Sequence, residues 1–266
     1  MKLYTRNYKI ITDIENQEYQ RILDIEKTQA KFGKINHYNE YPEAIKHYLS
    51  FFPNNHINLF EMKKRDIHSI NLQFQKLIHD ANVNEQDILR FINHEPQAYH
   101  IIASIFKAGG FTFGHHDAYL FPEFKLGKDF RADYLLIGKG SGGYEFIFTE
   151  FEKSNGRVTL KDGHLGQVVR SGENQITDWK RWIDSNFHTL NDFFDFEKNP
   201  ELELPQEFYK LDNTRMHYVV VGGTREDYKD KTYELRRRKL KESDIHMLHY
   251  DNLFDSSELL LQLNTF

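Results

Sequence analysis

The sequence predicts an α/β fold in which a mixed sheet is flanked by helices. Residues 130–153 contain two strand-like segments on either side of KGSGG (139–143), a strong turn signal, and therefore predict a hairpin of two buried strands. A near-continuous apolar run at 216–223, MHYVVVGG, is typical of a strand in the centre of a sheet. The segments follow the order helix, strands, helix, strand, helix, strand, which indicates a layered α/β arrangement.

Helices are predicted where apolar residues recur with helical spacing, over 84–96, 97–110, 164–185 and 224–243. Pro96 separates the first two of these helices, and Gly109-Gly110 is a stop signal for the second. Residues 244–253 predict a strand followed by a turn.

The length of 266 residues suits one large domain or two modest ones. We expect an accessory α/β domain over 1–84 and a second domain over 85–266. In the first, alternating patterns predict strands over 2–11 and 57–64, and helical patterns cover 42–52 and 65–82. The accessory segment carries no recognisable chemistry.

The composition excludes several classes of protein. The chain has no cysteine, which excludes disulfide scaffolds and cysteine-based zinc sites and fits a reducing cytoplasm. It has no apolar run of roughly 18 residues and no signal-peptide pattern, so we expect a soluble cytoplasmic protein that does not span a membrane. The net charge of -5 excludes a uniformly basic nucleic-acid coat protein, although a local basic face is enough to bind phosphates.

Carboxylates gather around the predicted hairpin. Strand side chains alternate between faces, so Glu150 and Glu152 share a face of 144–153 while Lys153 lies on the other. In a hairpin closed at 139–143, Asp133 lies opposite 149–150 and can approach Glu150 within a few ångströms. Buried carboxylates this close repel each other, and Mg²⁺ relieves the repulsion because it prefers carboxylate oxygens. Paired carboxylates also occur in glycosidases, but no aromatic sugar platform accompanies this pair.

The chain resembles the PD-(D/E)xK nuclease core and, more narrowly, the Shedu family of anti-phage defence nucleases. The resemblance covers about residues 86–255 and rests on an ordered set of stretches: FPEFKLGKDFRADYLLIG, YEFIFTEFEKSN, GQVVRSGENQITDWKRWI, YVVVGG and HYDNL. It implies cleavage of DNA by an oligomeric, tetrameric enzyme that uses Mg²⁺, with Mn²⁺ as a substitute. It also implies that Asp133 and Glu150 bind the metal, and that Gln175 is the polar helix residue that supports the site.

One position departs from the family pattern. The family would place a lysine two residues after Glu150, but this position is Glu152, and Lys153 follows one step later. Either a β-bulge turns Lys153 toward the site, or Glu152 takes the position as a further metal ligand, or the site is impaired and the chain is a module that binds nucleic acid or a partner protein. We expect Glu152 in the site.

Other residues are weaker candidates for the site or for DNA contact. His115 and His116 face opposite ways on a strand, so at most one of them points at any given site. A basic run in 224–243 can contact phosphates or form a solvated helix face; it comprises Arg236, Arg237, Arg238, Lys239 and Lys241. Two further polar residues are candidates near the carboxylates, namely Glu123 and Gln167.

Overall fold

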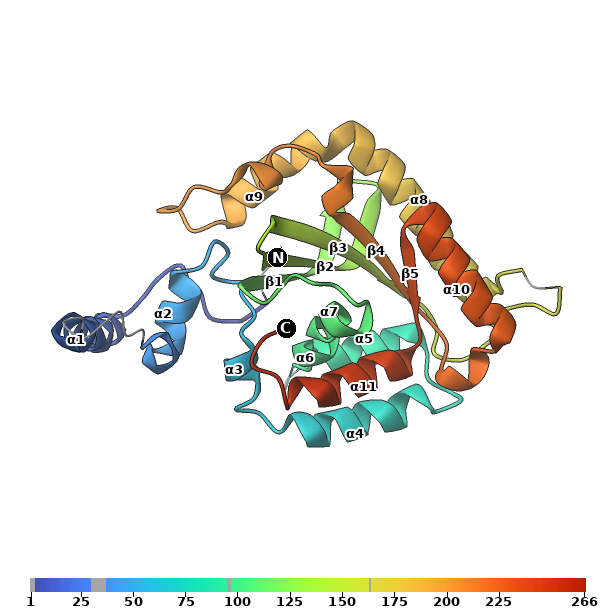
Figure 1. The fold of residues 1–266 in the computed structure, drawn as a ribbon, viewed down its shortest axis with the longest axis horizontal. Helices are drawn as coiled ribbons and strands as arrows, with labels where there is room; N and C mark the ends of the chain where they lie inside the picture. The colour runs from blue at the N-terminus through green and yellow to red at the C-terminus, as the bar shows by residue number, and fades with distance from the viewer. Residues whose placement is uncertain (1–2, 30–36, 95–96, 163) are drawn as a thin grey trace.

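A computed structural model describes residues 3–29, 37–94, 97–162 and 164–266 (Figure 1). Within them, one sheet has five strands in the order β1-β2-β3-β4-β5. The strands are β1 (Asp117–Leu126), β2 (Phe130–Gly140), β3 (Gly143–Phe151), β4 (Met216–Val221) and β5 (Ile245–Leu248). β1, β2 and β3 are antiparallel, whereas β4 and β5 run parallel to β3, so the sheet is mixed as predicted.

The predicted hairpin is formed by β2 and β3. Gly140 pairs with Gly143, and Gly143 has a φ of 108°, which glycine adopts without steric cost. The ladder then runs to the pair Tyr134 and Thr149. The predicted central strand is β4, which lies between β3 and β5 and is buried along most of its length.

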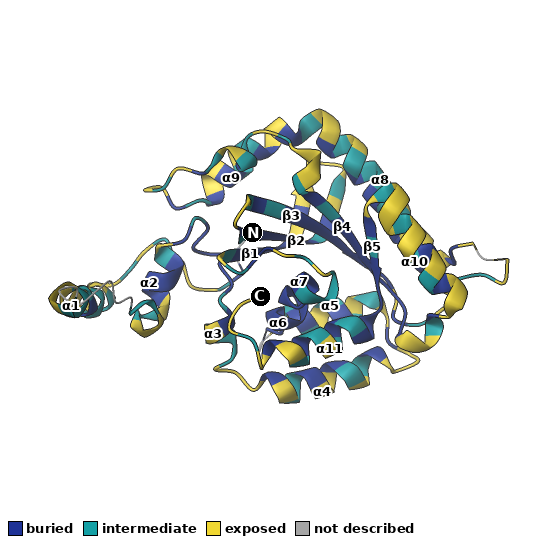
Figure 2. Ribbon diagram, in the orientation of Figure 1, coloured by how far each residue is buried: buried dark blue, intermediate teal, exposed yellow. Residues whose placement is uncertain are grey.

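Helices cover both faces of the sheet. One face packs against α8 (Gln167–Asn186), α9 (Asn191–Glu197) and α10 (Asp230–Ser243). The other face packs against a group of helices drawn below the sheet in Figure 1: α4 (Ile67–Ile78), α5 (Glu85–Asn93), α6 (Tyr99–Ala103), α7 (Ile105–Ala108) and α11 (Tyr250–Leu260). Figure 2 shows the strands buried and the outward faces of α8 and α10 exposed.

The two faces have separate cores, as the alternation of β3 requires. Phe146 and Phe148 pack with Trp179 of α8, whereas Ile147 and Phe151 belong to the core between the sheet and α11. Glu150 therefore lies on the face that α8 covers.

The expected strands of the N-terminal segment are wrong. Residues 3–10 form bends and turns, in which Asn54 accepts from the amide of Tyr8 through its side chain and from that of Leu3 through its backbone. Residues 57–64 contain the short helix α3 (Leu59–Met62), because Asn58 caps it by accepting from the amides of Phe60 and Glu61. The regular elements in the described part of 1–84 are helices, which include α1 (Asp13–Gln29) and α2 (Glu43–Tyr48).

Most of the other predicted elements are confirmed. The helix expected over 97–110 is divided at Ser104 into α6 and α7, and the segment expected as a turn after β5 is the helix α11. The expected separator Pro96 lies outside the described residues. The division at residues 84 and 85 stays a prediction, and α4 of the first part shares a core with α11 of the second.

None of the helices among the described residues is long and apolar enough to cross a membrane.

Candidate functional site

Asp133 lies where the ladder between β2 and β3 ends. Its Oδ2 accepts a hydrogen bond of 2.8 Å from the backbone amide of Phe151. The last pair of the ladder is Tyr134 with Thr149, so Asp133 lies opposite Glu150 in register, as the hairpin predicted. The carboxylate thus takes the place that a backbone carbonyl would fill in a longer ladder.

The strands are irregular beside Asp133. Ala132 and Leu135 pack into the same core although they are three residues apart, and Phe121 and Phe124 of the neighbouring strand do the same. Between the latter pair, Glu123 has a φ of 49°, which is uncommon for a non-glycine residue. The regular alternation of side chains between the two faces is therefore lost around position 133, and the side chain of Asp133 reaches the backbone of β3.

Glu150 is buried, with 6% of its surface exposed, on the face covered by α8. Gln175 of α8 donates a hydrogen bond of 2.5 Å from Nε2 to Glu150 Oε1. The other oxygen, Oε2, has no partner among the described residues. The structure thus brings Gln175 into direct contact with one of the predicted metal-binding acids.

Glu152 follows the end of β3 and is also buried, with 8% exposed. Its backbone donates to Val221 and accepts from the hydroxyl of Tyr250, so the extended chain is held past the last strand residue. Two glycines make room for its side chain. A Cβ at Gly172 of α8 would lie 3.2 Å from Glu152 Oε1, and a Cβ at Gly222 would lie 3.2 Å from Glu152 Cβ.

All three carboxylates hold their protons more tightly than usual. Burial is the main cause and raises the pKa of Asp133 to about 7, of Glu150 to about 9 and of Glu152 to about 7. The charges of Asp133 and Glu152 raise the pKa of Glu150 further, whereas the hydrogen bond from Gln175 lowers it. Mutual repulsion of this kind indicates that the three groups form one electrostatic cluster.

A fourth carboxylate, Glu85, belongs to the cluster and was missed from the sequence. It is the first residue of α5, its pKa is raised by burial, and its charge raises the pKa of Asp133, Glu150 and Glu152. The cap formed by Asn84 and Asp87 is visible in the sequence and marks where this helix begins. Only the tertiary packing of α5 places that helix end beside β3.

Lys153 is exposed, and its charge lowers the pKa of Glu85. It lines a cleft of about 570 Å³ together with Glu152, Arg157, Gln167 and Ser171. The cleft opens the cluster to solvent on the side of Glu152. Gln167 is therefore near the site but is not hydrogen-bonded to Glu150, whose partner on α8 is Gln175.

The carboxylate oxygens of this cluster are the type of ligand that a hard divalent cation prefers. Glu150 Oε2 and Glu152 Oε1 are buried without a partner in the described part of the chain, and a cation would stabilise the ionised form of each group. As the described side chains stand, no three of them converge closely enough to hold an ion. Asp133 Oδ2 is engaged by the Phe151 amide, so it must leave that amide to become a ligand through this oxygen.

Other sequence candidates lie apart from the cluster. His116 is exposed and packs on His115 at the start of β1, where the neighbouring Asp117 pairs with Lys139. Lys139 is six residues along β2 from Asp133, about 20 Å at a rise of about 3.3 Å per residue. The structure therefore does not bring these histidines to the carboxylates.

Glu123 lies closer to the carboxylates than the histidines do, as its charge raises the pKa of Asp133. Its own side chain is exposed, however, and pairs with Arg131 at 3.5 Å.

The basic run lies on α10. Arg237, Arg238 and Lys241 are exposed, Arg236 is partly buried, and Lys239 forms an ion pair with Glu173 of α8. These cations are available to solvent, and the pair joins α10 to the helix that carries Gln175.

The fold and the site together define a mixed α/β protein with a cluster of buried carboxylates where a hairpin ends. Residues 82–254 match the family model described as Shedu protein SduA, C-terminal, and the protein belongs to this family, because the match covers more than half of the chain. Membership implies a role in anti-phage defence. No curated protein matches the chain.

Proposed function

We propose that the protein is a metal-dependent DNA endonuclease, in which Asp133, Glu150 and Glu152 hold Mg²⁺, or Mn²⁺ in its place. The observation that carries this proposal is the cluster of three carboxylates with raised pKa values. Two of them, Glu150 and Glu152, are buried, and each has an oxygen without a hydrogen-bond partner in the described part of the chain. Such a cluster is unfavourable without a cation and favourable with one. Membership of the Shedu family supports the same reading.

Each side chain has a distinct part in this proposal. Gln175 fixes Glu150 by donating to Oε1 and leaves Oε2 for the cation. The glycines at 172 and 222 let Glu152 enter between α8 and the end of β4. A bound Mg²⁺ would neutralise charge on the scissile phosphodiester and orient a water for attack. Lys153 and Arg157 line the adjacent cleft and supply cations for the DNA phosphates.

The direct test is a titration of Mg²⁺ and of Mn²⁺ against supercoiled plasmid DNA and purified protein. We expect nicking that depends on the cation and stops when EDTA is added. Calorimetry with Mn²⁺ alone measures binding to the cluster without reference to cleavage. Absence of metal-dependent nicking by the wild type would contradict the proposal.

The roles of Glu152 and Lys153 are separable by two charge-removing variants. We expect Glu152→Gln to slow cleavage at least about 100-fold, because it removes a ligand, whereas loss of a group that only supports a ligand typically costs 10- to 100-fold. We expect Lys153→Gln to slow cleavage about tenfold or less, since an exposed cation contributes modestly. Rates of plasmid nicking at saturating Mg²⁺ measure both. A loss for Lys153→Gln as large as that for Glu152→Gln would show instead that the lysine acts in the site.

Gln175→Leu is expected to shift the pH dependence of cleavage upward. The hydrogen bond from Gln175 lowers the pKa of Glu150, so its removal raises that pKa, and ionisation requires a higher pH. A hydrogen bond to a charged group is worth about 1.5–3 kcal/mol, which corresponds to a shift of about one to two pH units. The measurement is the nicking rate from pH 6 to 10.

Gln167→Leu is the matched control for this prediction. Gln167 begins the same helix and lines the cleft but does not bond to Glu150. We expect its pH profile to match that of the wild type. An unchanged profile in Gln175→Leu, or equal shifts in both variants, would contradict the role of Gln175.

A second candidate function is binding of nucleic acid without cleavage. The observation that favours it is Glu152, which occupies the position of the family's lysine, while Lys153 is exposed and acts on Glu85. Gel-shift measurements beside the nicking assay separate the two functions, because a binding module retains DNA at every Mg²⁺ concentration without cutting it. The resemblance also implies a tetramer, and we propose that assembly on the same ground.

A further inference from the structure

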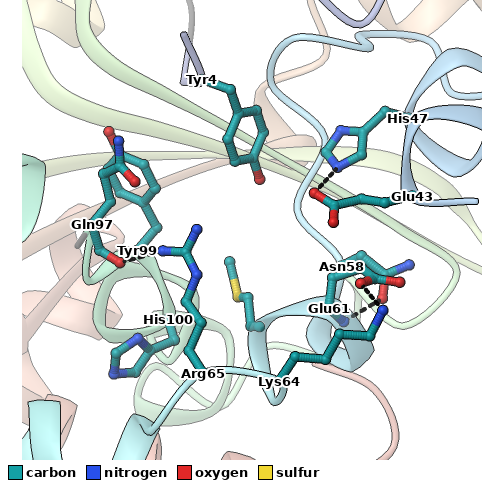
Figure 3. Close-up of a pocket in the computed structure, with 11 residues that line it drawn as sticks. Tyr4, Glu43, His47, Asn58, Glu61, Lys64, Arg65, Gln97, Tyr99 and His100 are labelled. Atoms are coloured by element: carbon teal, nitrogen blue, oxygen red, sulfur yellow. Dashed lines mark hydrogen bonds and ion pairs between the residues drawn. The ribbon is translucent and has the colours of Figure 1, made fainter. Parts of the chain in front are cut away.

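A second pocket, of about 170 Å³, lies between the N-terminal segment and α6 (Figure 3). Its walls come from the segment around Tyr4, from α2, from the end of α3 and from the start of α6. Most of its lining residues precede residue 82 and so lie outside the part of the chain that matches the Shedu family model. None of the four clustered carboxylates lines it.

His47 presents a bare ring nitrogen to Glu43 at this pocket. His47 Nδ1 lies 3.0 Å from the carbonyl oxygen of Pro53, which can only accept, so Nδ1 carries the proton. Burial lowers the pKa of His47 to about 4, so the ring is neutral at pH 7 and Nε2 is an acceptor. Nε2 lies 3.9 Å from Glu43 Oε1, and the Glu43 side chain is 48% exposed. Glu43 Oε1 also accepts a hydrogen bond of 3.0 Å from the hydroxyl of Tyr8, which leaves the charge of the carboxylate in place. A carboxylate beside an acceptor nitrogen favours a cationic donor that both can share.

Arg65 provides the opposite charge on the other side of the pocket. Figure 3 shows its guanidinium pointing into the pocket across from Glu43 and His47. One nitrogen donates to the carbonyl oxygen of Gln97 at 2.9 Å, and none of the described carboxylates forms an ion pair with it. The charges of Glu43 and Arg65 act in opposite senses on the hydroxyl of Tyr4, which therefore lies within reach of both.

The remaining charges at the pocket are already neutralised within the protein. Glu61 pairs with the buried Lys46 at 2.7 Å and with Lys64 at 2.5 Å. Among the described residues, no opposite charge within ion-pair distance neutralises Glu43 or Arg65, although Glu43 accepts from the Tyr8 hydroxyl and Arg65 donates to Gln97. Glu43 with His47, and Arg65, are therefore the two groups at the pocket wall whose charges can recognise a ligand.

We propose that this pocket binds a small zwitterion of the size of an amino acid, with its ammonium group at Glu43 and His47 and its carboxylate on Arg65. The volume has room for roughly six waters at about 30 Å³ each, which a molecule of that size would displace. Arg65 suits a carboxylate because its guanidinium offers paired donors. A metal ion fits less well, since Glu43 and His47 supply two ligands and the described residues hold no group of three.

The test is calorimetric titration of the full-length protein with free L-amino acids. Each amino acid is compared with its matching amine and carboxylic acid, for example alanine with ethylamine and with propionate. We expect at least one amino acid to bind, and its amine and acid to bind at least about tenfold more weakly, because each lacks one charge-assisted contact. Absence of binding by every amino acid would overturn the proposal.

Variants identify the groups responsible. Glu43→Gln and Arg65→Gln are each expected to weaken binding at least about tenfold, whereas Lys64→Gln, in the same wall but paired with Glu61, should change it little. Circular dichroism verifies that each variant is folded. An amino acid bound equally by the wild type and Glu43→Gln, or Zn²⁺ bound through Glu43 and His47 without regard to Arg65, would also overturn it. The readout needs no DNA cleavage, so its outcome is independent of the proposed nuclease.

Discussion

Replacing Glu150 with glutamine is expected to abolish metal-dependent cleavage while the protein stays folded. The variant keeps the volume of the side chain and an oxygen to accept from Gln175, but it removes the charge that a cation requires. We expect the nicking rate at saturating Mg²⁺ to fall at least ~10²–10³-fold, since loss of a metal ligand exceeds the loss of a supporting residue. Calorimetry should show a parallel loss of Mn²⁺ affinity.

The same substitution should not destabilise the metal-free protein. Because the pKa of Glu150 is raised to about 9, the metal-free wild type holds a neutral side chain here at pH 7, and glutamine replaces it with another neutral side chain. At higher pH the glutamine also avoids the repulsion by Asp133 and Glu152 that ionised Glu150 would meet. Thermal unfolding in EDTA is the measurement, with Glu234→Gln, an exposed carboxylate on α10, as the matched control. Cleavage within threefold of the wild type, or loss of cleavage only because the variant unfolds, would contradict the assigned role.

The stability of the metal-free protein is expected to fall between about pH 7 and pH 9. Burial raises the pKa of Glu150 to about 9 in the folded state, well above its ordinary value. In this range the folded protein therefore holds a proton that the unfolded chain has lost, and the free energy of unfolding decreases by about 1.4 kcal/mol per pH unit. Over two pH units the loss is about 3 kcal/mol, to which Asp133 and Glu152 contribute at the lower end.

The pH range matters because the buried histidines affect stability in the opposite sense. Their lowered pKa values make the free energy of unfolding increase, not decrease, as the pH rises through a more acidic range. Burial lowers the pKa of His47 to about 4 and of His100 to about 3, so their effect on stability is confined to more acidic solutions. Urea unfolding in EDTA at pH 7, 8 and 9 measures the predicted slope, which Glu150→Gln should flatten. Mn²⁺ at 1,000 times its dissociation constant should restore about 4 kcal/mol. A wild-type stability that is constant from pH 7 to 9 would show that Glu150 is ionised without a cation.

The hairpin and its facing acids were predictable because they depend on local signals. Two alternating segments around a glycine-rich turn fix both the register and the face, and Asp133 lies opposite Glu150 accordingly. The contact of Gln175 with Glu150 was anticipated only through the family resemblance, since the residues are joined by tertiary packing.

Errors arose where long-range packing or a capping side chain decides the structure. Asn58 turns an apparently alternating segment into the start of a helix, and Asn54 holds the segment around Leu3 and Tyr8 without a strand partner. Glu85 was missed because its helix precedes the hairpin by about 40 residues, and no periodic pattern tells which end of a helix meets a sheet.

The bond from the Phe151 amide to Asp133 gives the cluster a spectroscopic reporter. The backbone N–H of Phe151 points at the carboxylate instead of at a strand carbonyl, so its proton chemical shift and its exchange with solvent depend on the state of that carboxylate. Protonation of Asp133, or its capture by a cation, reaches this amide directly. A nuclear magnetic resonance signal from one backbone position can therefore follow occupancy of the site without DNA and without turnover.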